Sequence, residues 1–255
     1  MIVLKSPLEL DAMRAAGRIA ALARDAVAKA IRPGIATREL DAVAEEVIRR
    51  HGAIPSFKGY PNPIPGGPAF PGSICASINS EVVHGIPGRR RLKDGDILSV
   101  DVGAYFEGFH GDCACTLTVG EADPEARRLI RVTEDCLKAA TGECRPGKRL
   151  SDLSHAIQSY AERHGFSVVR EYVGHGIGRN MHEDPQIPNF GPPGMGPILQ
   201  AGMVFAIEPM VNVGTFQVKT GKDMWTVVTA DGSLSAHFED TVAVTDQGPV
   251  VLTAL

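Results

Sequence analysis

A repeated segment constrains the fold of this chain more than any other sequence feature. The tripeptide Arg-Pro-Gly occurs at residues 32–34 and again at 145–147, an offset of 113 residues. At the same offset a His-Gly pair recurs, at residues 51–52 and 164–165, where the glycine is a typical helix stop. Chance, or the residues common at all helix ends, explains one such match but not several in one register. The repeat therefore predicts a chain built from two related halves.

Apolar residues inside each copy follow the spacing of an amphipathic helix, at i, i+3, i+4, i+7 and i+8. A β-rich segment follows each helix, at residues 54–60 and 166–173. We therefore predict one domain of residues 1–255 with pseudo-symmetric α+β halves, about 1–120 and 121–255, and a functional site between them. The apolar positions are Leu40, Val43, Ala44, Val47 and Ile48 in the first copy, and Leu153, Ala156, Ile157, Tyr160 and Ala161 in the second.

The stretch 101–112, DVGAYFEGFHGD, predicts a hairpin with a carboxylate on each arm. β-rich segments precede and follow it, and Glu107-Gly108 is the turn. Asp101 lies in an otherwise apolar strand, where an isolated carboxylate is unfavourable, whereas Asp112 alone is equally well an exposed turn or edge residue. Two carboxylates that face each other across a hairpin repel unless a cation lies between them. The pair therefore indicates a cation site, provided that other ligands exist.

Three further polar residues lie in apolar, β-rich contexts: His175, Glu208 and Glu239. Singly, each has an ordinary explanation, as a loop histidine, a strand end and a solvent-facing strand residue, respectively. Together with the two aspartates they form a hard donor set that suits Mn, Fe, Co or Zn, in a pair bridged by carboxylates. One divalent ion does not balance four buried carboxylates, whereas two nearly do.

Several other functional classes find little support. The string GHGIG at 174–178 lacks the third glycine of a dinucleotide loop, His182-Glu183 lacks the second histidine of H-E-x-x-H, and no G-x-S-x-G elbow occurs. The net charge of −4, with no basic run beyond 89–91, argues against nucleic-acid binding, and no apolar run is long enough to span a membrane. Five cysteines without a C-x-x-C pair, and an N-terminus without the apolar core of a signal peptide, predict free thiols and a cytoplasmic location.

Five strings, in their order and spacing, resemble the type I methionine aminopeptidases of the M24 metallopeptidase family. They are NSEVVHGIP (79–87), DVGAYFEGFHGD (101–112), GHGIGRNMHEDPQIP (174–188), FAIEPMV (205–211) and HFEDTVAV (237–244). The resemblance implies an α+β pita-bread fold, a pseudo-two-fold repeat of helix pairs packed on a curved, mainly antiparallel β-sheet. It also implies a single catalytic domain that removes the initiator methionine from nascent proteins and peptides when the second residue is small.

The resemblance further implies roles for the metal-binding residues. Asp112 and Glu239 would bridge two divalent ions (Co, Mn, Fe or Zn), and Asp101 would bind only one of them. His175 and Glu208 would complete the other ion. A water or hydroxide between the ions would attack the scissile peptide, with Glu208 as its proton shuttle.

Other residues would hold the substrate. Considered alone, His84 is an ordinary loop histidine, and His182 is a surface residue or one that supports the ligands without binding metal. By the resemblance, both would hydrogen-bond the scissile peptide and stabilise the tetrahedral intermediate. Phe70 and Met181 stand where the family commonly has Tyr and Phe, and the Pro/Gly-rich loop 61–72 is longer than usual, so the slot departs from the family pattern. Trp225 alone is equally well a core residue. The apolar slot for methionine would be lined by Tyr60, Phe70, Cys75, Met181 and Trp225.

Two alternatives stay open: a proline-directed aminopeptidase of the same fold, or a non-catalytic pita-bread binding protein. The first carries an extra N-terminal domain, for which this chain has no room, and the second would lack some of the five ligands, all of which are present. The expected partners are nascent polypeptide N-termini near the ribosome exit, without nucleic acid or membrane, and the chain is expected to be a monomer. The donor set does not specify which metal is used in the cell.

Overall fold

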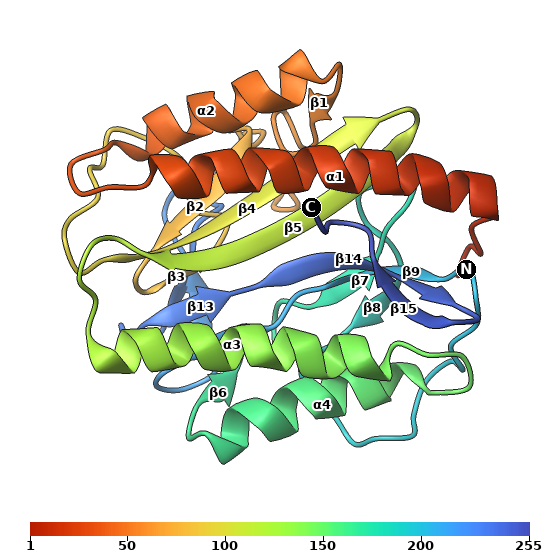
Figure 1. Cartoon of the computed structure of the whole chain (residues 1–255). Helices are drawn as coiled ribbons and strands as arrows, with labels where there is room; N and C mark the ends of the chain where they lie inside the picture. The colour runs from red at the N-terminus through yellow and green to blue at the C-terminus, as the bar shows by residue number, and fades with distance from the viewer.

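Two helix pairs flank a curved sheet in the computed structural model, which describes residues 1–255. Helix α1 packs beside α2, and α3 packs beside α4, with one pair along each half of the sheet (Figure 1). No helix is long and apolar enough to cross a membrane. The helices are α1 (Pro7–Ala30), α2 (Thr37–Arg50), α3 (Pro124–Glu143) and α4 (Leu150–Arg163).

The second helix of each pair ends in the same way, as the repeat predicts. Helices α2 and α4 are both 14 residues long. The Nδ1 atoms of His51 and His164 each lie 2.8 Å from the carbonyl oxygen four residues earlier. The glycine that follows has a φ of 75° at Gly52 and 77° at Gly165, a left-handed conformation that favours glycine. The predicted duplication of helix pairs is confirmed.

The main sheet has nine strands, all paired antiparallel. Its order is β1-β4-β5-β14-β9-β7-β8, with β2 added on β4 and β15 on β14. The strands are β1 (Ile54–Pro55), β2 (Ile74–Ile78), β4 (Ile97–Phe106), β5 (Phe109–Thr118), β7 (Gly174–Gly176), β8 (Glu183–Ile187), β9 (Val204–Ile207), β14 (Glu239–Thr245) and β15 (Gly248–Val251). Two three-stranded sheets contain β3 (Glu81–Val83), β11 (Val218–Thr220) and β12 (Val227–Thr229), and β6 (Ser167–Val168), β10 (Met210–Asn212) and β13 (Ser235–His237).

The two β-rich segments expected after the helices are much shorter than predicted. They form only the two-residue strands β1 and β6. After β1 the backbone leaves the sheet, because Gly59 donates its amide to the carbonyl of Phe70 and Phe70 donates to that of Tyr60. Strand β6 pairs only with the three-residue β10. The length of both strands is therefore set by the backbone segments available for pairing, and not by the β-preference of their residues.

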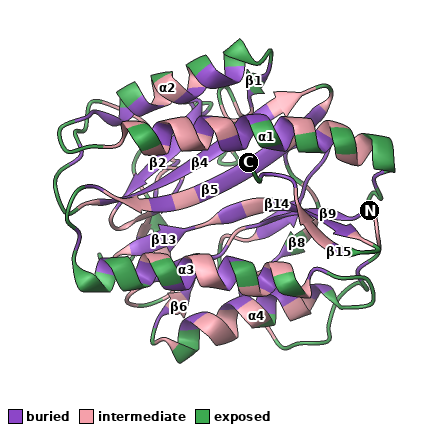
Figure 2. Cartoon of the chain, viewed as in Figure 1, coloured by how far each residue is buried: buried purple, intermediate pink, exposed green.

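Alternation along the strands separates the helix-covered face of the sheet from the face that carries polar groups. Val100, Val102 and Cys113 pack with residues of α1 and α2 in one buried cluster. Asp101 and Asp112 lie at the intervening positions of β4 and β5, so they point away from these helices. Figure 2 shows the buried strands beneath helices whose outer faces are exposed. Helix α1 approaches β5 closely, since a Cβ atom on Gly111 would lie 2.4 Å from the Cα of Gly17.

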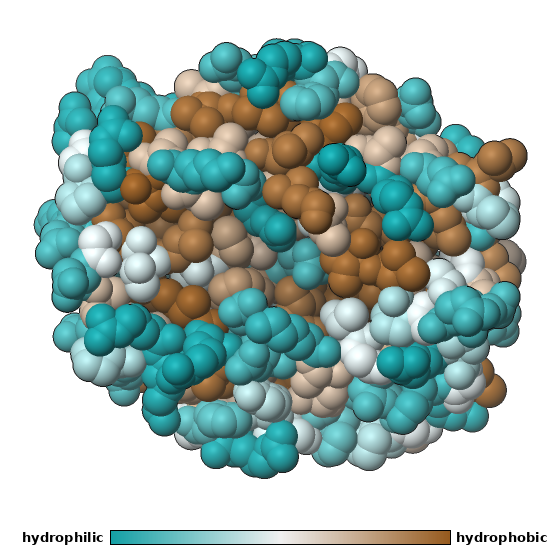
Figure 3. Space-filling model, viewed as in Figure 1, coloured by the Kyte–Doolittle hydropathy of each residue, from teal (hydrophilic) through white to brown (hydrophobic).

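The helix-bearing face holds a larger cavity than the face that carries the polar groups. It has a volume of about 590 Å³ and lies between α1 and α3, where Figure 3 shows apolar atoms between charged side chains. The charged groups around it are paired with one another, Arg24 with Asp240 at 3.5 Å and Lys138 with Glu134 at 2.8 Å. Its size alone therefore does not make it the reactive site, which lies on the opposite face.

Candidate active site

Five neighbouring strands each contribute one of the predicted metal ligands. In the sheet order β4-β5-β14-β9-β7, the second half of the chain supplies the last three strands. Each ligand lies within its strand or, for Glu208, directly after it. Residues far apart in sequence thus form one continuous row across the sheet. In strand order the row is Asp101, Asp112, Glu239, Glu208 and His175.

The two hairpin aspartates do not face each other directly, which corrects the sequence-based expectation. Asp101 is paired with Ala114, and Asp112 with Gly103. The carboxylates are therefore diagonal neighbours on one face, a position from which side chains still interact. Thr241 of β14 fixes the backbone of Asp112, because its hydroxyl accepts from the Asp112 amide at 3.0 Å and donates to the carbonyl at 2.8 Å.

Burial and mutual repulsion disfavour ionisation of these carboxyl groups. Asp112 and Glu239 are only 3% and 2% exposed. Burial raises the pKa of Asp101 to about 7. Burial, together with the neighbouring carboxylates, also raises the pKa values of Asp112, Glu208 and Glu239 well above normal. The buried Oδ1 atoms of Asp101 and Asp112 and the Oε1 atom of Glu239 have no hydrogen-bond partner.

The unpartnered oxygens fit divalent cations. A cation removes the repulsion and supplies the partner that each oxygen lacks. The structure contains two groups of potential metal ligands, and within each group the ligand atoms lie within 4.8 Å of one another. One group is Asp112, His175 and Glu239, and the other is Glu208, His237 and Glu239. Both groups contain Glu239, and their carboxylate and imidazole donors fit divalent metal ions.

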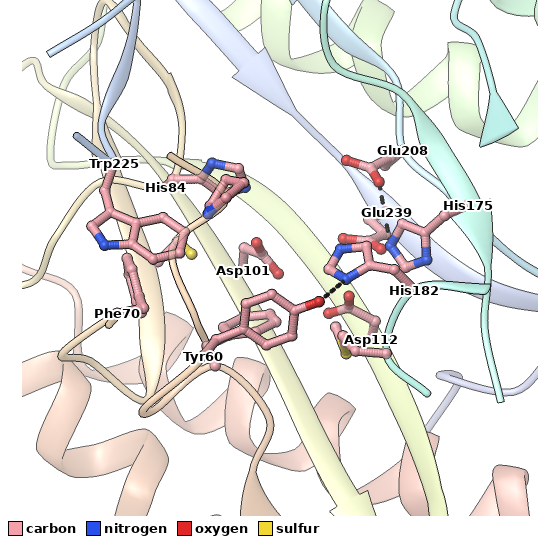
Figure 4. Close-up of a pocket in the computed structure, with 14 residues that line it drawn as sticks. Tyr60, Phe70, His84, Asp101, Asp112, His175, His182, Glu208, Trp225 and Glu239 are labelled. Atoms are coloured by element: carbon pink, nitrogen blue, oxygen red, sulfur yellow. Dashed lines mark hydrogen bonds and ion pairs between the residues drawn. The ribbon is translucent and has the colours of Figure 1, made fainter. Parts of the chain in front are cut away.

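His175 is oriented as a ligand. Its Nδ1 atom lies 2.9 Å from the carbonyl oxygen of Gly176, so that this nitrogen carries the proton. The other ring nitrogen, Nε2, lies 3.6 Å from Oε1 of Glu208 (Figure 4). Burial lowers the pKa of His175 to about 3, which keeps the imidazole neutral and its Nε2 lone pair available.

All twelve predicted site residues surround one cavity of about 280 Å³ (Figure 4). The metal-ligand candidates form one wall, and aromatic and sulfur-containing side chains form the other. Phe57 and Pro63, which the sequence did not single out, also line it. The twelve are Tyr60, Phe70, Cys75, His84, Asp101, Asp112, His175, Met181, His182, Glu208, Trp225 and Glu239.

Known proteins share this architecture over the full chain. The model of metallopeptidase family M24 matches residues 11–246. The chain belongs to the M24 metallopeptidases. It is 56% identical over 253 residues to methionine aminopeptidase 1 of Bacillus subtilis, covering 99% of each chain. It is 53% identical to the methionine aminopeptidase of Clostridium perfringens over the whole of both chains.

Solved structures confirm the pita-bread fold of this M24 peptidase. The methionine aminopeptidase of Thermotoga maritima superimposes with a TM-score of 0.96 at 46% identity, covering all of both chains. The prolidase of Pyrococcus furiosus gives a TM-score of 0.79 at 22% identity, with 99% of this chain covering 66% of that one. The prolidase shares the fold alone, so the fold does not separate methionine-directed from proline-directed members.

The apolar wall of the M24 peptidase adjoins its carboxylates through strand register. Cys75 of β2 is paired with Asp101 of β4. Cys75, Phe70 and Trp225 form a small buried cluster, with the last two rings edge to face at 5.2 Å. The indole Nε1 of Trp225 donates to the carbonyl of Pro68 at 2.8 Å, which ties the loop 61–72 to this wall. Trp225 is therefore both a packed residue and part of the cavity lining.

Two histidines project into the cavity from constrained loops. His84 has a φ of 59°, uncommon for a residue with a side chain, and burial lowers its pKa to about 4. His182 is held by Tyr60, whose hydroxyl lies 2.6 Å from Nδ1. The loop that carries His182 is fixed by a buried ion pair, since Lys5 Nζ lies 2.6 Å from Oε2 of Glu183.

Two further histidines, one buried and one half-buried, were missed by the sequence interpretation. His237 is 2% exposed, and its Nε2 atom lies 3.6 Å from Glu208 Oε2 and 3.8 Å from Glu239 Oε2. His110 contacts Ser56 Oγ through Nδ1 at 2.9 Å, and burial lowers its pKa to about 4. Both stand two residues before a predicted ligand, so strand alternation was the signal that could have identified them.

The metal-free M24 peptidase is expected to lose stability between about pH 6.5 and 8.5. Asp101 keeps its proton in the folded state up to a pKa of about 7, whereas in the unfolded chain it has already lost it. The folded state therefore binds more protons, and its stability falls as pH rises through this pKa. Histidines of the unfolded chain are half protonated at pH 6.5 and oppose this trend at the lower end of the range. Asp112, Glu208 and Glu239 maintain the fall in stability, because burial also raises their pKa values well above normal in the folded state.

Thermal unfolding in a chelator, repeated with saturating Mn²⁺, measures the effect. We expect the midpoint of the metal-free protein to fall by several degrees across the range, since about 1 kcal/mol corresponds to about 2–4 °C for a chain of this size. Bound metal favours the ionised carboxylates and should flatten the profile. A midpoint of the metal-free protein that rises with pH would contradict the buried, cation-deficient site.

Proposed function

We propose that this M24 peptidase removes the N-terminal methionine from nascent polypeptides whose second residue is small. One observation carries the proposal: a cluster of hard metal ligands adjoins an aromatic, sulfur-containing slot within a single cavity of about 280 Å³. Methionine suits such a slot because its thioether packs favourably against aromatic rings. The identity of 53–56% to methionine aminopeptidases over the full chain supports the same substrate.

The position of each ligand in the sheet suggests its role toward two divalent ions. Asp112 and Glu239 lie on the adjacent central strands β5 and β14, which supports a bridging role for both. Asp101 lies on the outer side of Asp112, and His175 and Glu208 lie on the outer side of Glu239, so these three would each bind one ion. When bound, the ions lower the pKa of a water molecule and polarise the scissile carbonyl.

The remaining groups position the substrate and move protons. Glu208, whose pKa is raised, accepts a proton at its carboxylate and returns it to the leaving amine. His84 and His182 hydrogen-bond the scissile peptide from the loops that hold them rigidly. The free α-amine lies near Asp101, at the junction of the carboxylate wall and the slot, which restricts cleavage to the first residue.

The cytoplasmic location expected from the sequence is consistent with a nascent-chain substrate. Nascent chains expose their N-termini near the ribosome exit, so we place the enzyme in the cytoplasm. We further propose that residues 1–255 act as a single catalytic domain and a monomer, because the halves about 1–120 and 121–255 together supply every ligand of the site.

Peptide hydrolysis tests the substrate. The purified, metal-loaded protein is expected to release methionine from Met-Gly-Met-Met and much less from Met-Lys-Met-Met, because the side chain of the second residue meets the cavity wall formed by the metal-ligand candidates. An Ala-Pro-initiated peptide tests the proline-directed alternative, and a chelator-treated sample is the control. Products are followed by mass spectrometry. Release of alanine from the Ala-Pro peptide, with methionine retained on both Met peptides, would contradict the proposal.

A further inference from the structure

His237 is buried beside Glu208 and Glu239, outside the lining of the cavity. It ends strand β13, whose pairing with β10 sets His237 opposite Met210, two residues after Glu208. The backbone of His237 is fixed by Thr116, whose hydroxyl accepts from its amide and donates to its carbonyl, each at 2.8 Å. The backbone from which the imidazole projects is therefore held in place.

The surroundings of the His237 ring lack a hydrogen bond that would explain its position. Its Nε2 atom has no hydrogen-bond partner, although Glu208 Oε2 lies at 3.6 Å and Glu239 Oε2 at 3.8 Å. Both distances exceed those of hydrogen bonds. They do suit atoms that share a cation, because ligands bound at about 2.0–2.2 Å lie at most about 4.4 Å apart. The three side chains form one of the two candidate ligand groups of the molecule.

Glu208 is thereby placed between two imidazoles. Its Oε1 atom faces Nε2 of His175, and its Oε2 atom faces Nε2 of His237, each at 3.6 Å. Figure 4 shows the Glu208 carboxylate joined to His175 by a dashed line, with Glu239 beside them. Glu239 contributes to both candidate groups and so links the two histidines.

We propose that His237 is a second imidazole ligand of the metal centre, binding through Nε2 on the Glu208 side. The inference rests on the proposed two-ion function and adds a ligand to it. A second imidazole makes that ion's site softer than one built from oxygen donors and a single histidine. Imidazole suits Zn, Co and Fe, whereas Mn prefers oxygen ligands, so His237 should favour the first group.

Counting the bound histidines in the Co²⁺-loaded protein tests the proposal. Each imidazole bound to Co²⁺ gives one solvent-exchangeable, hyperfine-shifted N–H proton resonance. We expect two such resonances in the wild-type protein, and one in each of the variants His175→Gln and His237→Gln. His110→Gln is the control, a half-buried histidine outside both ligand groups, and should retain two. A single resonance in the wild type, or two in His237→Gln, would overturn the assignment.

Metal affinity supplies a second measurement. By calorimetry on the metal-free protein, His237→Gln should weaken Zn²⁺ or Co²⁺ binding at one site by at least about tenfold and Mn²⁺ binding by less. If His237→Gln does not fold, the wild-type count and that of His175→Gln still decide. If the wild-type protein releases methionine but shows only one resonance, the assignment of His237 as a ligand is wrong and the proposed function stands. If the wild-type protein shows two resonances but releases no methionine, the assignment of His237 stands and the proposed function is wrong.

Discussion

Asp112→Asn is expected to abolish metal binding and peptidase activity while raising the thermal stability of the metal-free protein. The opposite signs have one cause. Burial and the charges of Glu239 and Asp101 raise the pKa of Asp112, so the neutral amide relieves repulsion in the metal-free state. The same change removes the proposed bridging oxygen. We expect metal affinity to fall by more than about 100-fold, beyond the usual effect of losing a supporting residue.

Metal analysis, peptide assay and unfolding in chelator measure the three effects. The midpoint of metal-free Asp112→Asn should rise by a few degrees, and added metal should no longer raise it. Glu239→Gln should behave alike, because Glu239 is equally buried and unpartnered. Asp184→Asn is the control, since its side chain is 65% exposed and should change none of the three. Full activity in either ligand variant would rule out a bridging role.

His182→Ala is expected to lower kcat by about 10²–10³, the cost of removing one donor that stabilises a developing oxyanion. Its metal content should not change, because His182 belongs to neither candidate ligand group. The side chain contacts the cavity from the loop held by Lys5 and Glu183, with Tyr60 fixing its Nδ1 atom at 2.6 Å. The loss should therefore affect the chemical step more than substrate binding.

Tyr60→Phe is the matched variant, since it retains the aromatic wall and removes only the hydroxyl that orients His182. We expect it to lower kcat less than His182→Ala does. Steady-state kinetics on Met-Gly-Met-Met, together with metal analysis of both variants, separate the effects. A loss of metal that parallels the loss of activity in His182→Ala would show that this histidine binds metal instead.

Local sequence determined the helices, the hairpin and the chemical types of the ligands. The capping box of Ser6 and Glu9, and the glycine stops of α2 and α4, depend on contacts within a few residues. The turn at Glu107-Gly108 likewise separates β4 and β5 as predicted. Carboxylates in apolar strands already indicated a cation, because their unfavourable burial depends on composition rather than on tertiary arrangement.

Only the tertiary structure decided how those residues meet. Sheet order places β14 beside β5 and sets Glu239 opposite Ala114, two residues from Asp112, a pairing between segments more than a hundred residues apart that no local pattern encodes. Register made the two hairpin aspartates diagonal neighbours and set Cys75 against Asp101. His237 lies beside Glu208 because β13 pairs with β10, and long-range pairing of this kind depends on the packing of the whole sheet.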